Sequence, residues 1–220
     1  MVDRRSYGDP CGVARALDAV GERWALLVVR ELLFGPKRYA DLSRGLPGMS
    51  QNVLSQRLRE LEQEGIVARR RLGPPASIRV YELTERGQAL EPVLTALSRW
   101  GSRTIVDPTA ELSVDALMLA LRTTFDAGAA GDLRVSIELR FADDRFHAEI
   151  ESGRCRIARG AADHPDAVLD TDAATLRSVV FGGRPLMDVM DVMHVIGDRR
   201  GAARFVGCFP RPTPFEAGEG

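Results

Sequence analysis

The chain has 220 residues, enough for one large domain or two small ones. Apolar residues make up 45% of it and charged residues 28%, the balance of an ordinary globular protein rather than a membrane or fibrous one. The formal net charge of −1 would by itself argue against a nucleic-acid-binding protein. However, residues 1–107 carry 17 Lys and Arg against 13 Asp and Glu, whereas residues 108–220 carry 13 against 18. A basic half followed by an acidic half predicts two domains with different partners.

Apolar side chains recur at helical spacing through the first part of the basic half. Helices are expected over residues 11–20, 22–34, 39–44 and 51–64. Gly35-Pro36 ends the second of these, because proline cannot continue a helix. Ser50 is placed to cap the N-terminus of the fourth, whose apolar side is expected to consist of Leu54, Leu58 and Leu61.

The other side of the helix over 51–64 is polar. Its side chains are Gln51, Asn52, Ser55, Gln56 and Arg59. Amide side chains can pair with adenine and arginine can pair with guanine, so this face suits the major groove of DNA. A solvated helix surface has a similar composition, and the helix alone does not separate the two interpretations.

Two strands are expected over residues 66–72 and 78–83, joined by a turn that contains Gly73 and two prolines. A helical pair followed by an arginine-rich hairpin predicts a winged helix-turn-helix, in which the second helix reads the groove and the wing contacts phosphate. A solvated charge cluster on an edge strand is the alternative for the arginines. The residues expected to contact phosphate are Lys37, Ser50, Arg57, Arg69, Arg70, Arg71 and Arg79.

Thr84 is expected to cap one long helix over residues 85–105, with Gly87 as an early weak point. The helix carries more apolar side chains than a small domain needs for its own core. They are Leu90, Val93, Leu94, Leu97, Trp100 and Ile105. This surplus indicates a homodimer helix packed with the helix over 11–20, or else a helix that covers the second domain.

Several motifs over residues 8–105 resemble HxlR-type regulators. They are Cys11-Gly-Val-Ala-Arg-Ala-Leu-Asp-Ala-Val-Gly-Glu-Arg-Trp, Arg38-Tyr-Ala-Asp-Leu, Leu46-Pro-Gly-Met-Ser, Leu54-Ser-Gln-Arg-Leu-Arg-Glu-Leu-Glu and Tyr81-Glu-Leu-Thr-Glu-Arg-Gly. The resemblance implies a dimeric winged-helix transcription factor, with the recognition helix at 50–63 and the wing at 69–80. Repression is expected because it is common in that family.

The same resemblance makes Cys11 a redox candidate, since some members of the family sense electrophiles or oxidants through this cysteine. The family usually has Cys-Pro where this chain has Cys11-Gly12. A thiol at a helix N-terminus can be reactive, although cysteine more often serves as a small buried apolar residue.

The acidic half is expected to be an α+β sandwich, with helices on one face of an antiparallel sheet. Residues 106–112 are expected to link domains at 1–106 and 107–220, and the tail from Pro210 is expected to be disordered. In the strand over 133–141, Ser136, Glu138 and Arg140 alternate with apolar residues and are expected to face water. The expected helices are 114–125, 173–181, 186–190 and 199–208, the expected strands are 133–141, 145–151, 154–159, 167–170 and 192–196, and 128–132 is expected to be a loop.

The second half also resembles the sterol carrier protein type 2 family, over residues 113–209. The motifs are Phe146-His-Ala-Glu-Ile-Glu-Ser-Gly-Arg-Cys-Arg-Ile-Ala-Arg-Gly, Pro165-Asp-Ala-Val-Leu-Asp-Thr-Asp, residues 176–183 and Ile196-Gly-Asp-Arg-Arg-Gly-Ala-Ala-Arg-Phe. The resemblance implies an apolar tunnel that holds a lipid-like or other hydrophobic ligand, whereas plain core packing is the alternative. The pocket is expected to be lined by Phe125, Ile137, Phe141, Phe146, Val180, Phe181, Met187, Met190, Met193 and Phe205.

No enzymatic activity, metal or cofactor is expected. The sequence has no glycine-rich phosphate loop and no Gly-x-Ser-x-Gly turn, and His147, His164 and His194 lie in separate elements. The longest apolar runs have six residues, against about 20 for a membrane span. No signal peptide is recognised, and three widely spaced cysteines do not form a disulfide framework, so a cytoplasmic protein without membrane association is expected.

These observations predict a ligand-responsive transcriptional regulator, acting as a homodimeric repressor on double-stranded DNA, with a hydrophobic effector in the second domain. Two alternatives remain. In one, Cys11 senses redox state and the second domain is structural or binds a protein. In the other, the chain is a lipid carrier with a vestigial DNA-binding module.

Overall fold

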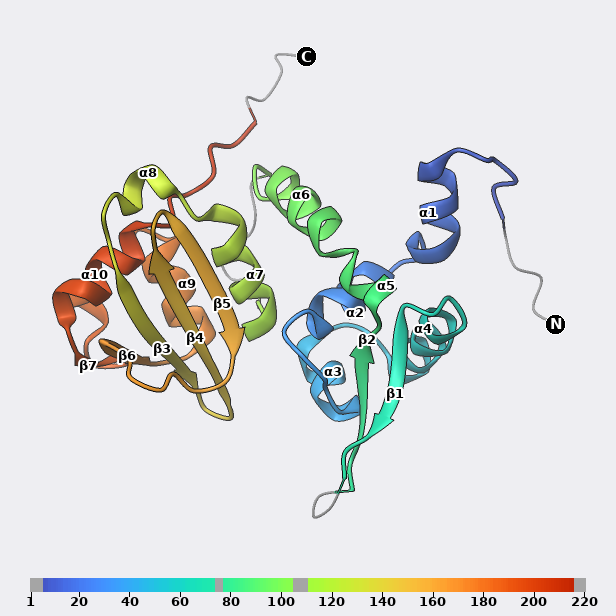
Figure 1. The fold of residues 1–220 in the computed structure, drawn as a ribbon, viewed down its shortest axis with the longest axis horizontal. Helices are drawn as coiled ribbons and strands as arrows, with labels where there is room; N and C mark the ends of the chain where they lie inside the picture. The colour runs from blue at the N-terminus through green and yellow to red at the C-terminus, as the bar shows by residue number, and fades with distance from the viewer. Residues whose placement is uncertain (1–5, 74–76, 105–110, 216–220) are drawn as a thin grey trace. The chain divides into compact units, whose positions relative to one another are not determined.

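The computed structural model describes residues 6–73, 77–104 and 111–215. The chain separates into two compact units, a first unit of residues 1–94 and a second unit of residues 95–220 (Figure 1). Most of the expected linker at 106–112 lies outside the described residues.

The first unit begins with four helices, as the sequence predicts. They are α1 (Gly12–Val20), α2 (Ala25–Leu32), α3 (Tyr39–Gly45) and α4 (Gln51–Gln63). Helix α2 starts later than expected because Trp24 adopts a left-handed conformation with φ of 79°, so residues 22–24 form a turn. The core lies between α2, α3 and α4, where Val28, Leu42 and Leu58 are fully buried.

Strands β1 (Val67–Arg71) and β2 (Arg79–Leu83) form the expected antiparallel hairpin. Its turn residues 74–76 lie outside the described part of the chain. Lys37 forms a β-bridge to Tyr81, with N···O distances of 2.9 and 2.8 Å in the two directions. The hairpin is therefore attached through its backbone to the segment that leads into α3.

The single helix expected over 85–105 is wrong, because the segment forms α5 (Glu85–Gln88) and α6 (Glu91–Gly101). Pro92 has no N–H with which to continue the helical ladder from Gln88, and proline suits the first turn of a new helix. Gly87 also packs tightly, since a Cβ there would lie 2.2 Å from the carbonyl oxygen of Ile66. Helix α6 starts in the first unit and ends in the second.

The second unit has α+β architecture, with one layer of helices on a five-stranded sheet (Figure 1). Its helices are α7 (Val114–Thr124), α8 (Ala127–Ala130), α9 (Ala173–Val180), the 3₁₀ helix η1 (Leu186–Val189) and α10 (Arg199–Gly207). Its strands are β3 (Val135–Phe141), β4 (Asp144–Glu151), β5 (Arg154–Arg159), β6 (Ala167–Asp170) and β7 (His194–Gly197). Helix α8 replaces an expected loop, because the Asp126 carboxylate accepts hydrogen bonds from the amides of Gly128 and Ala129 at 2.7 and 3.2 Å.

The sequence predicts an antiparallel sheet, but the observed sheet is mixed. Its strand order is β5-β4-β3-β6-β7, and β6 runs parallel to β3. Because β5 lies at the far edge, the connection from β5 to β6 must cross β4 and β3. The apolar face of the sheet packs against the helix layer, where Leu139, Phe146 and Phe205 are fully buried.

Glu138 is the main departure from the expected wet face of β3. Its side chain is buried, with the residue only 2% exposed. The crossing segment covers it, since the Ala162 amide donates to Glu138 Oε2 at 3.1 Å, and Arg140 Nε donates to Oε1 at 2.6 Å. Burial would raise the pKa of Glu138, but the hydrogen bonds and charges of Arg140, Ala162 and Arg145 hold that pKa below its ordinary value.

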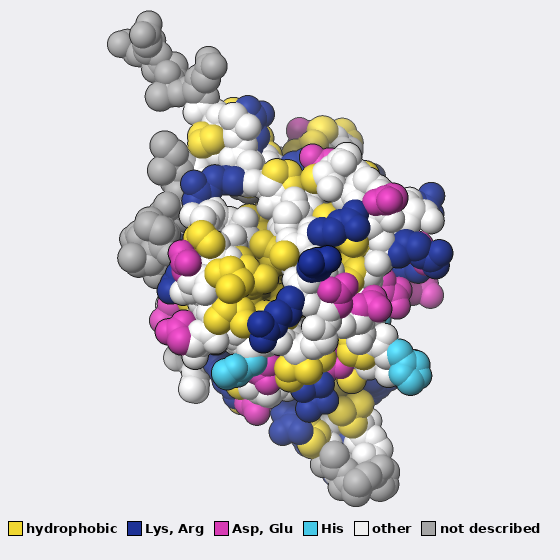
Figure 2. All heavy atoms as spheres, turned by 90° about the vertical axis from the view of Figure 1, so that its left-hand side faces the viewer, with side chains coloured by type: hydrophobic (Ala, Val, Ile, Leu, Met, Phe, Trp, Pro, Cys, Tyr) yellow, Lys and Arg dark blue, Asp and Glu magenta, His cyan; other side chains and the backbone are white. Residues whose placement is uncertain are grey.

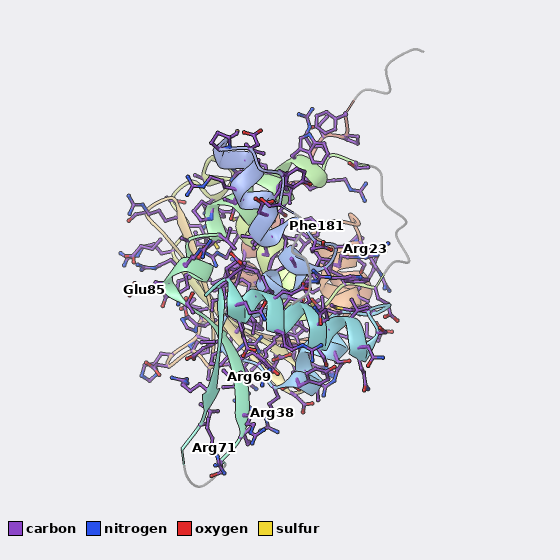
Figure 3. The ribbon with its side chains drawn as sticks, turned by 90° about the vertical axis from the view of Figure 1, so that its right-hand side faces the viewer. Arg23, Arg38, Arg69, Arg71, Glu85 and Phe181 are labelled. Carbon is purple, nitrogen blue, oxygen red and sulfur yellow. The ribbon has the colours of Figure 1, made fainter. Side chains whose placement is uncertain are left out.

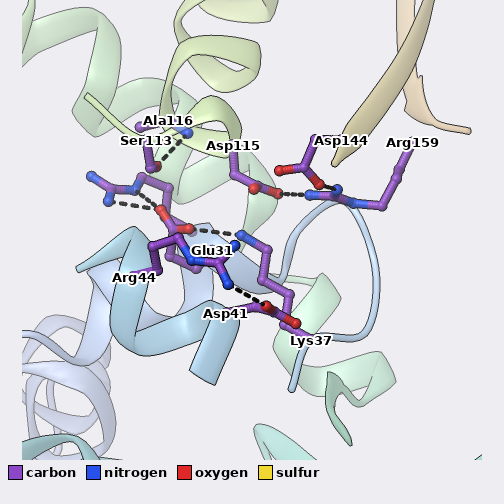
Figure 4. Close-up of polar contacts among 10 residues, drawn as sticks. Glu31, Lys37, Asp41, Arg44, Ser113, Asp115, Ala116, Asp144 and Arg159 are labelled. Atoms are coloured by element: carbon purple, nitrogen blue, oxygen red, sulfur yellow. Dashed lines mark hydrogen bonds and ion pairs between the residues drawn. The ribbon is translucent and has the colours of Figure 1, made fainter. Parts of the chain in front are cut away.

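A buried ion pair joins α7 to the sheet (Figure 4). Arg159 Nη2 at the end of β5 lies 2.6 Å from Asp115 Oδ1 in the first turn of α7, and Arg159 also pairs with Asp144. The guanidinium lies 4.4 Å from the ring centre of Phe146. Asp115 is almost fully buried, so these contacts fix the position of α7.

Residues 210–215 follow a defined path, although the sequence predicts a disordered tail. Arg211 Nε donates to the carbonyl oxygen of Phe181 at 2.6 Å, and the amide of Phe215 donates to the carbonyl oxygen of Arg103 at 3.0 Å. The Arg103 guanidinium lies 4.0 Å from the centre of the Phe215 ring. The tail is thus held both at the end of α9 and just beyond α6.

Candidate nucleic-acid interface

Helices α3 and α4 form a helix-turn-helix around a short connection. Gly48 in this connection has φ of +83°, a backbone conformation that glycine adopts readily. Ser50 then caps α4, because its hydroxyl oxygen accepts a hydrogen bond from the Val53 amide at 3.4 Å. Leu54, Leu58 and Leu61 are buried as expected, and the opposite side of α4 is consequently turned outward.

The structure brings the five expected base-contacting residues together on one side of α4, which we call the polar face of α4. Gln51, Asn52 and Arg59 are exposed, and Ser55 and Gln56 are half-buried. Arg59 Nη2 donates to Gln56 Oε1 and Gln56 Nε2 donates to Glu60 Oε1, both at 2.7 Å. These bonds orient the Gln56 amide and the Arg59 guanidinium along the helix surface.

Two of the expected phosphate-contacting cations are instead held by carboxylates of their own unit. The Lys37 side chain is 10% exposed, and its Nζ lies 2.8 Å from Oε2 of the fully buried Glu31 (Figure 4). The Arg57 side chain is 11% exposed and pairs with Glu60 and with Glu22, the latter at 3.6 Å. Both cations therefore stabilise the helical body rather than project from it.

The hairpin, which we call the wing (residues 67–83), presents its arginines differently along its length. Arg69 and Arg70 are half-exposed and pair with Glu62 at 2.8 Å and Glu82 at 3.2 Å. Arg71 and Arg79 lie directly opposite each other near the turn, both exposed, and have no carboxylate partner among the described residues. Figure 3 shows Arg71 near the far end of the wing. Like charges placed opposite each other destabilise a hairpin, and an anion bound between them would offset this repulsion.

Arg38 is an exposed cation that the expected site did not include. It precedes α3 as its N-cap residue and follows Lys37, whose backbone bridges to Tyr81 of the wing. Figure 3 shows its side chain beside the wing. It has no carboxylate partner in the described part of the chain, and the basic pair Lys37-Arg38 was the sequence signal that could have identified it.

The expected pocket residues of the second unit differ in their exposure. Ile137, Phe141, Phe146, Val180, Met193 and Phe205 are buried, and Phe125, Phe181 and Met190 are half-buried. Met187 is 75% exposed on η1 and so lines no interior space. Figure 2 shows an apolar patch on one face of this unit. Separately, Met187, Val192 and Ile196 of this unit are exposed apolar residues.

Of the three cysteines, Cys11 is exposed, Cys155 is half-buried and Cys208 is buried. Burial raises the pKa of the Cys155 thiol to about 12. Cys208 adds to this increase, and the positive charge of Arg122 partly opposes it. The Cys155 thiol is therefore protonated and unreactive near neutral pH. Cys11 occupies the N-cap position of α1 and uses no side-chain capping bond.

A helix-turn-helix followed by an arginine-bearing, two-stranded wing defines the winged-helix class of DNA-binding proteins. The profile of the family described as HxlR-like helix-turn-helix matches residues 19–108. YvaP of Bacillus subtilis (strain 168), an uncharacterized HTH-type transcriptional regulator, is 42% identical over 96 residues, covering 43% of this chain and 87% of YvaP. YodB of the same strain, an HTH-type transcriptional regulator, is 39% identical over 89 residues, covering 40% of this chain and 79% of YodB.

The solved structure of the reduced form of YodB from B. subtilis has 36% sequence identity and covers 46% of this chain and 98% of that chain, with a TM-score of 0.38. The chain belongs to the HxlR-like helix-turn-helix family and is a DNA-binding transcriptional regulator. The family match ends at residue 108, before the sheet of the second unit begins. Among the described residues, no helix combines the length and the apolar composition needed to cross a membrane.

Proposed function

We propose that the polar face of α4 enters the major groove and reads base edges while the wing grips phosphates. Gln51, Asn52, Ser55, Gln56 and Arg59 are assigned to bases. Ser50, Arg69, Arg70, Arg71 and Arg79 are assigned to phosphates, together with Arg38. The observation that carries the proposal is the facing pair Arg71 and Arg79, which have no carboxylate partner in the described structure, whereas Lys37 and Arg57 are paired inside the unit.

The regulator is proposed to act as a homodimer. Val13 and Leu17 on α1 and Val93, Leu97 and Trp100 on α6 are all exposed, Trp100 by 65%. The three on α6 are spaced i, i+4 and i+7, so they form one apolar stripe. A second copy packed on α1 and α6 would remove this surface from water. The two α4 helices would then reach half-sites about 34–36 Å apart on a near-palindromic operator.

The second unit is proposed to be the effector domain, with a sterol-carrier-like fold that takes a hydrophobic ligand. Its layer of helices on one sheet and its buried apolar side chains, which include Phe146, Phe205 and Met193, support this assignment. A ligand can change DNA affinity only through different affinities for the binding and non-binding states. Helix α6 includes the boundary between the two units, and the coupling is proposed to pass through it. The expected output is repression that the ligand relieves.

The DNA-binding proposal is tested by selecting a duplex motif with the full chain and measuring affinity for that motif and for a scrambled duplex. Sequence-selective binding is expected, and the combined variant Gln51→Ala, Asn52→Ala should lose the selectivity. If this variant keeps the selectivity of the wild type, the assignment of α4 is wrong. Selective binding at nanomolar concentration would also contradict a lipid carrier with a vestigial DNA-binding module.

The effector proposal is tested by native mass spectrometry of the full chain purified from its host. A co-purifying hydrophobic molecule that changes operator affinity supports it. An empty protein that gives no thermal shift with any of a panel of apolar compounds contradicts it.

A second candidate function is redox sensing through Cys11, which its exposure on α1 favours. Oxidation at this position would alter the apolar surface assigned to the dimer. Operator binding is titrated with diamide for the wild type and for Cys11→Ser. Loss of binding by the wild type alone supports sensing, and equal loss in both contradicts it.

A further inference from the structure

The hydroxyl group of Tyr39 on α3 lies against the first two turns of α4. Its oxygen is 2.8 Å from the backbone carbonyl oxygen of Gln51 and 3.1 Å from Ser55 Oγ. Gln51 and Ser55 are one helical turn apart, and both belong to the polar face of α4. One side chain of the preceding helix therefore holds the N-terminal part of that face.

These two contacts determine the direction of both hydrogen bonds. A hydroxyl group has one hydrogen to donate and two lone pairs that accept. The Gln51 carbonyl oxygen can only accept, so the hydrogen of Tyr39 goes to Gln51. The hydrogen in the second bond must then come from Ser55. Ser55 is left with lone pairs alone for any group that approaches its half-exposed side.

We infer that Tyr39 sets which base edges Ser55 can recognise, and this inference rests on the proposed placement of α4 in the major groove. There, adenine and cytosine present amino donors, whereas guanine and thymine present acceptors at the corresponding edges. A Ser55 whose hydrogen is committed pairs only with the amino groups. A free serine hydroxyl would pair with either kind of edge. Tyr39 is thus a positioning residue that confers base selectivity without contacting DNA.

The test compares Tyr39→Phe, which removes one oxygen atom, with the wild type in parallel selections from a random duplex library. Ser55→Ala identifies the base position that Ser55 reads. At that position the wild type should select adenine or cytosine on the facing strand. Tyr39→Phe should reduce this preference about fivefold, the effect of one hydrogen bond, and leave the other positions unchanged.

Two further variants separate this role from a structural one. Tyr81→Phe removes the same atom from the wing and should keep every base preference. Tyr7→Phe removes the same atom from an exposed residue that precedes α1 and should also keep every base preference. The melting temperature of each variant shows that it is folded.

Four outcomes would overturn the inference. In the first, the selected motif changes in the Gln51→Ala, Asn52→Ala variant but stays the same in Tyr39→Phe. The role of Tyr39 is then wrong, while the placement of α4 stands. The role of Tyr39 is also wrong if the wild type selects guanine or thymine at the position that Ser55 reads. It is equally wrong if Tyr39→Phe loses base preference to the same extent at all positions. Selection of no motif by the wild type overturns the placement of α4 and the inference with it.

Discussion

The second unit and the far end of the wing use charged side chains in opposite ways. In the second unit, the buried carboxylates of Asp115 and Glu138 are paired with arginines that lie close in space, so the charges hold the fold together. In the wing of the first unit, Arg71 and Arg79 face each other with no carboxylate between them in the described structure. Removing one partner of a buried ion pair destabilises the fold, whereas like charges that face each other suit the proposed anionic partner. Variants that remove a charge from either place separate these two roles.

The largest effect is expected from breaking the buried pair. Asp115→Ala leaves Arg159 with only the partly exposed Asp144, so the free energy of unfolding of the second unit should fall by about 3 kcal/mol. Chemical denaturation followed by circular dichroism measures this. The matched control is Asp132→Ala, which removes a carboxylate that is 95% exposed and pairs with Arg204, and should change stability by less than about 1 kcal/mol. Equal effects would show that burial does not distinguish the two pairs.

The next effect concerns a base contact. Arg59→Ala should weaken binding to the selected operator by about 1–3 kcal/mol and relax the sequence preference at one base pair of each half-site. Fluorescence anisotropy on operator variants measures both quantities. Arg134→Ala is the control, since it removes an exposed arginine of the second unit. An Arg59→Ala protein that weakens binding to all duplexes alike would move Arg59 from base recognition to phosphate contact.

A smaller effect is expected at the wing. Arg71→Ala should weaken binding to every duplex by a similar factor and lower the slope of log affinity against log salt by about one. Because Arg79 would lose a like charge opposite it, the first unit should keep or slightly gain stability. DNA titrations at several salt concentrations between about 50 and 200 mM measure the slope. A thermal melt measures the stability. An unchanged salt slope would remove Arg71 from the interface.

The smallest effect depends on pH. The pKa of Glu138 is lower in the folded chain than its ordinary value of 4.5. The ionised carboxylate therefore stabilises the fold at pH values above 4.5. This contribution is lost as the pH falls through the lower pKa of the folded chain. The stability difference between wild type and Glu138→Gln should therefore shrink as pH falls below about 4.5. Denaturant midpoints from pH 7 downward measure it. A stability difference between the two proteins that stays constant with pH would mean that the Glu138 carboxylate is equally ionised in the folded and unfolded states.

Local patterns in the sequence predicted most of the elements. The spacing of Leu54, Leu58 and Leu61 set the orientation of α4, and Ser50 and Thr84 cap helices as expected. These features depend on residues three or four positions apart, and the sequence contains that information directly. The polar face of α4 was predictable for the same reason.

Most of the features that were missed depend on contacts that helical and strand periodicity do not predict. Lys37 looks like a free cation until the turn after α2 brings Glu31, six residues away, beside it. Arg57 looks like a free cation although Glu60 is only three residues away, and its second partner Glu22 comes from a distant part of the unit. Glu138 looks solvent-exposed until the parallel β6 requires a crossing segment above it. By contrast, Pro92 was a local signal for the start of α6 that the apolar periodicity concealed.

The most direct test of the central claim, that α4 reads the major groove, is methylation interference on the selected operator. Methylation at N7 of guanine blocks the major-groove edge that arginine recognises. We predict that methylating one guanine in each half-site prevents binding of the wild type and no longer affects the residual binding of Arg59→Ala. Interference that is the same for both proteins, or that occurs only at minor-groove positions of adenine, would contradict the account.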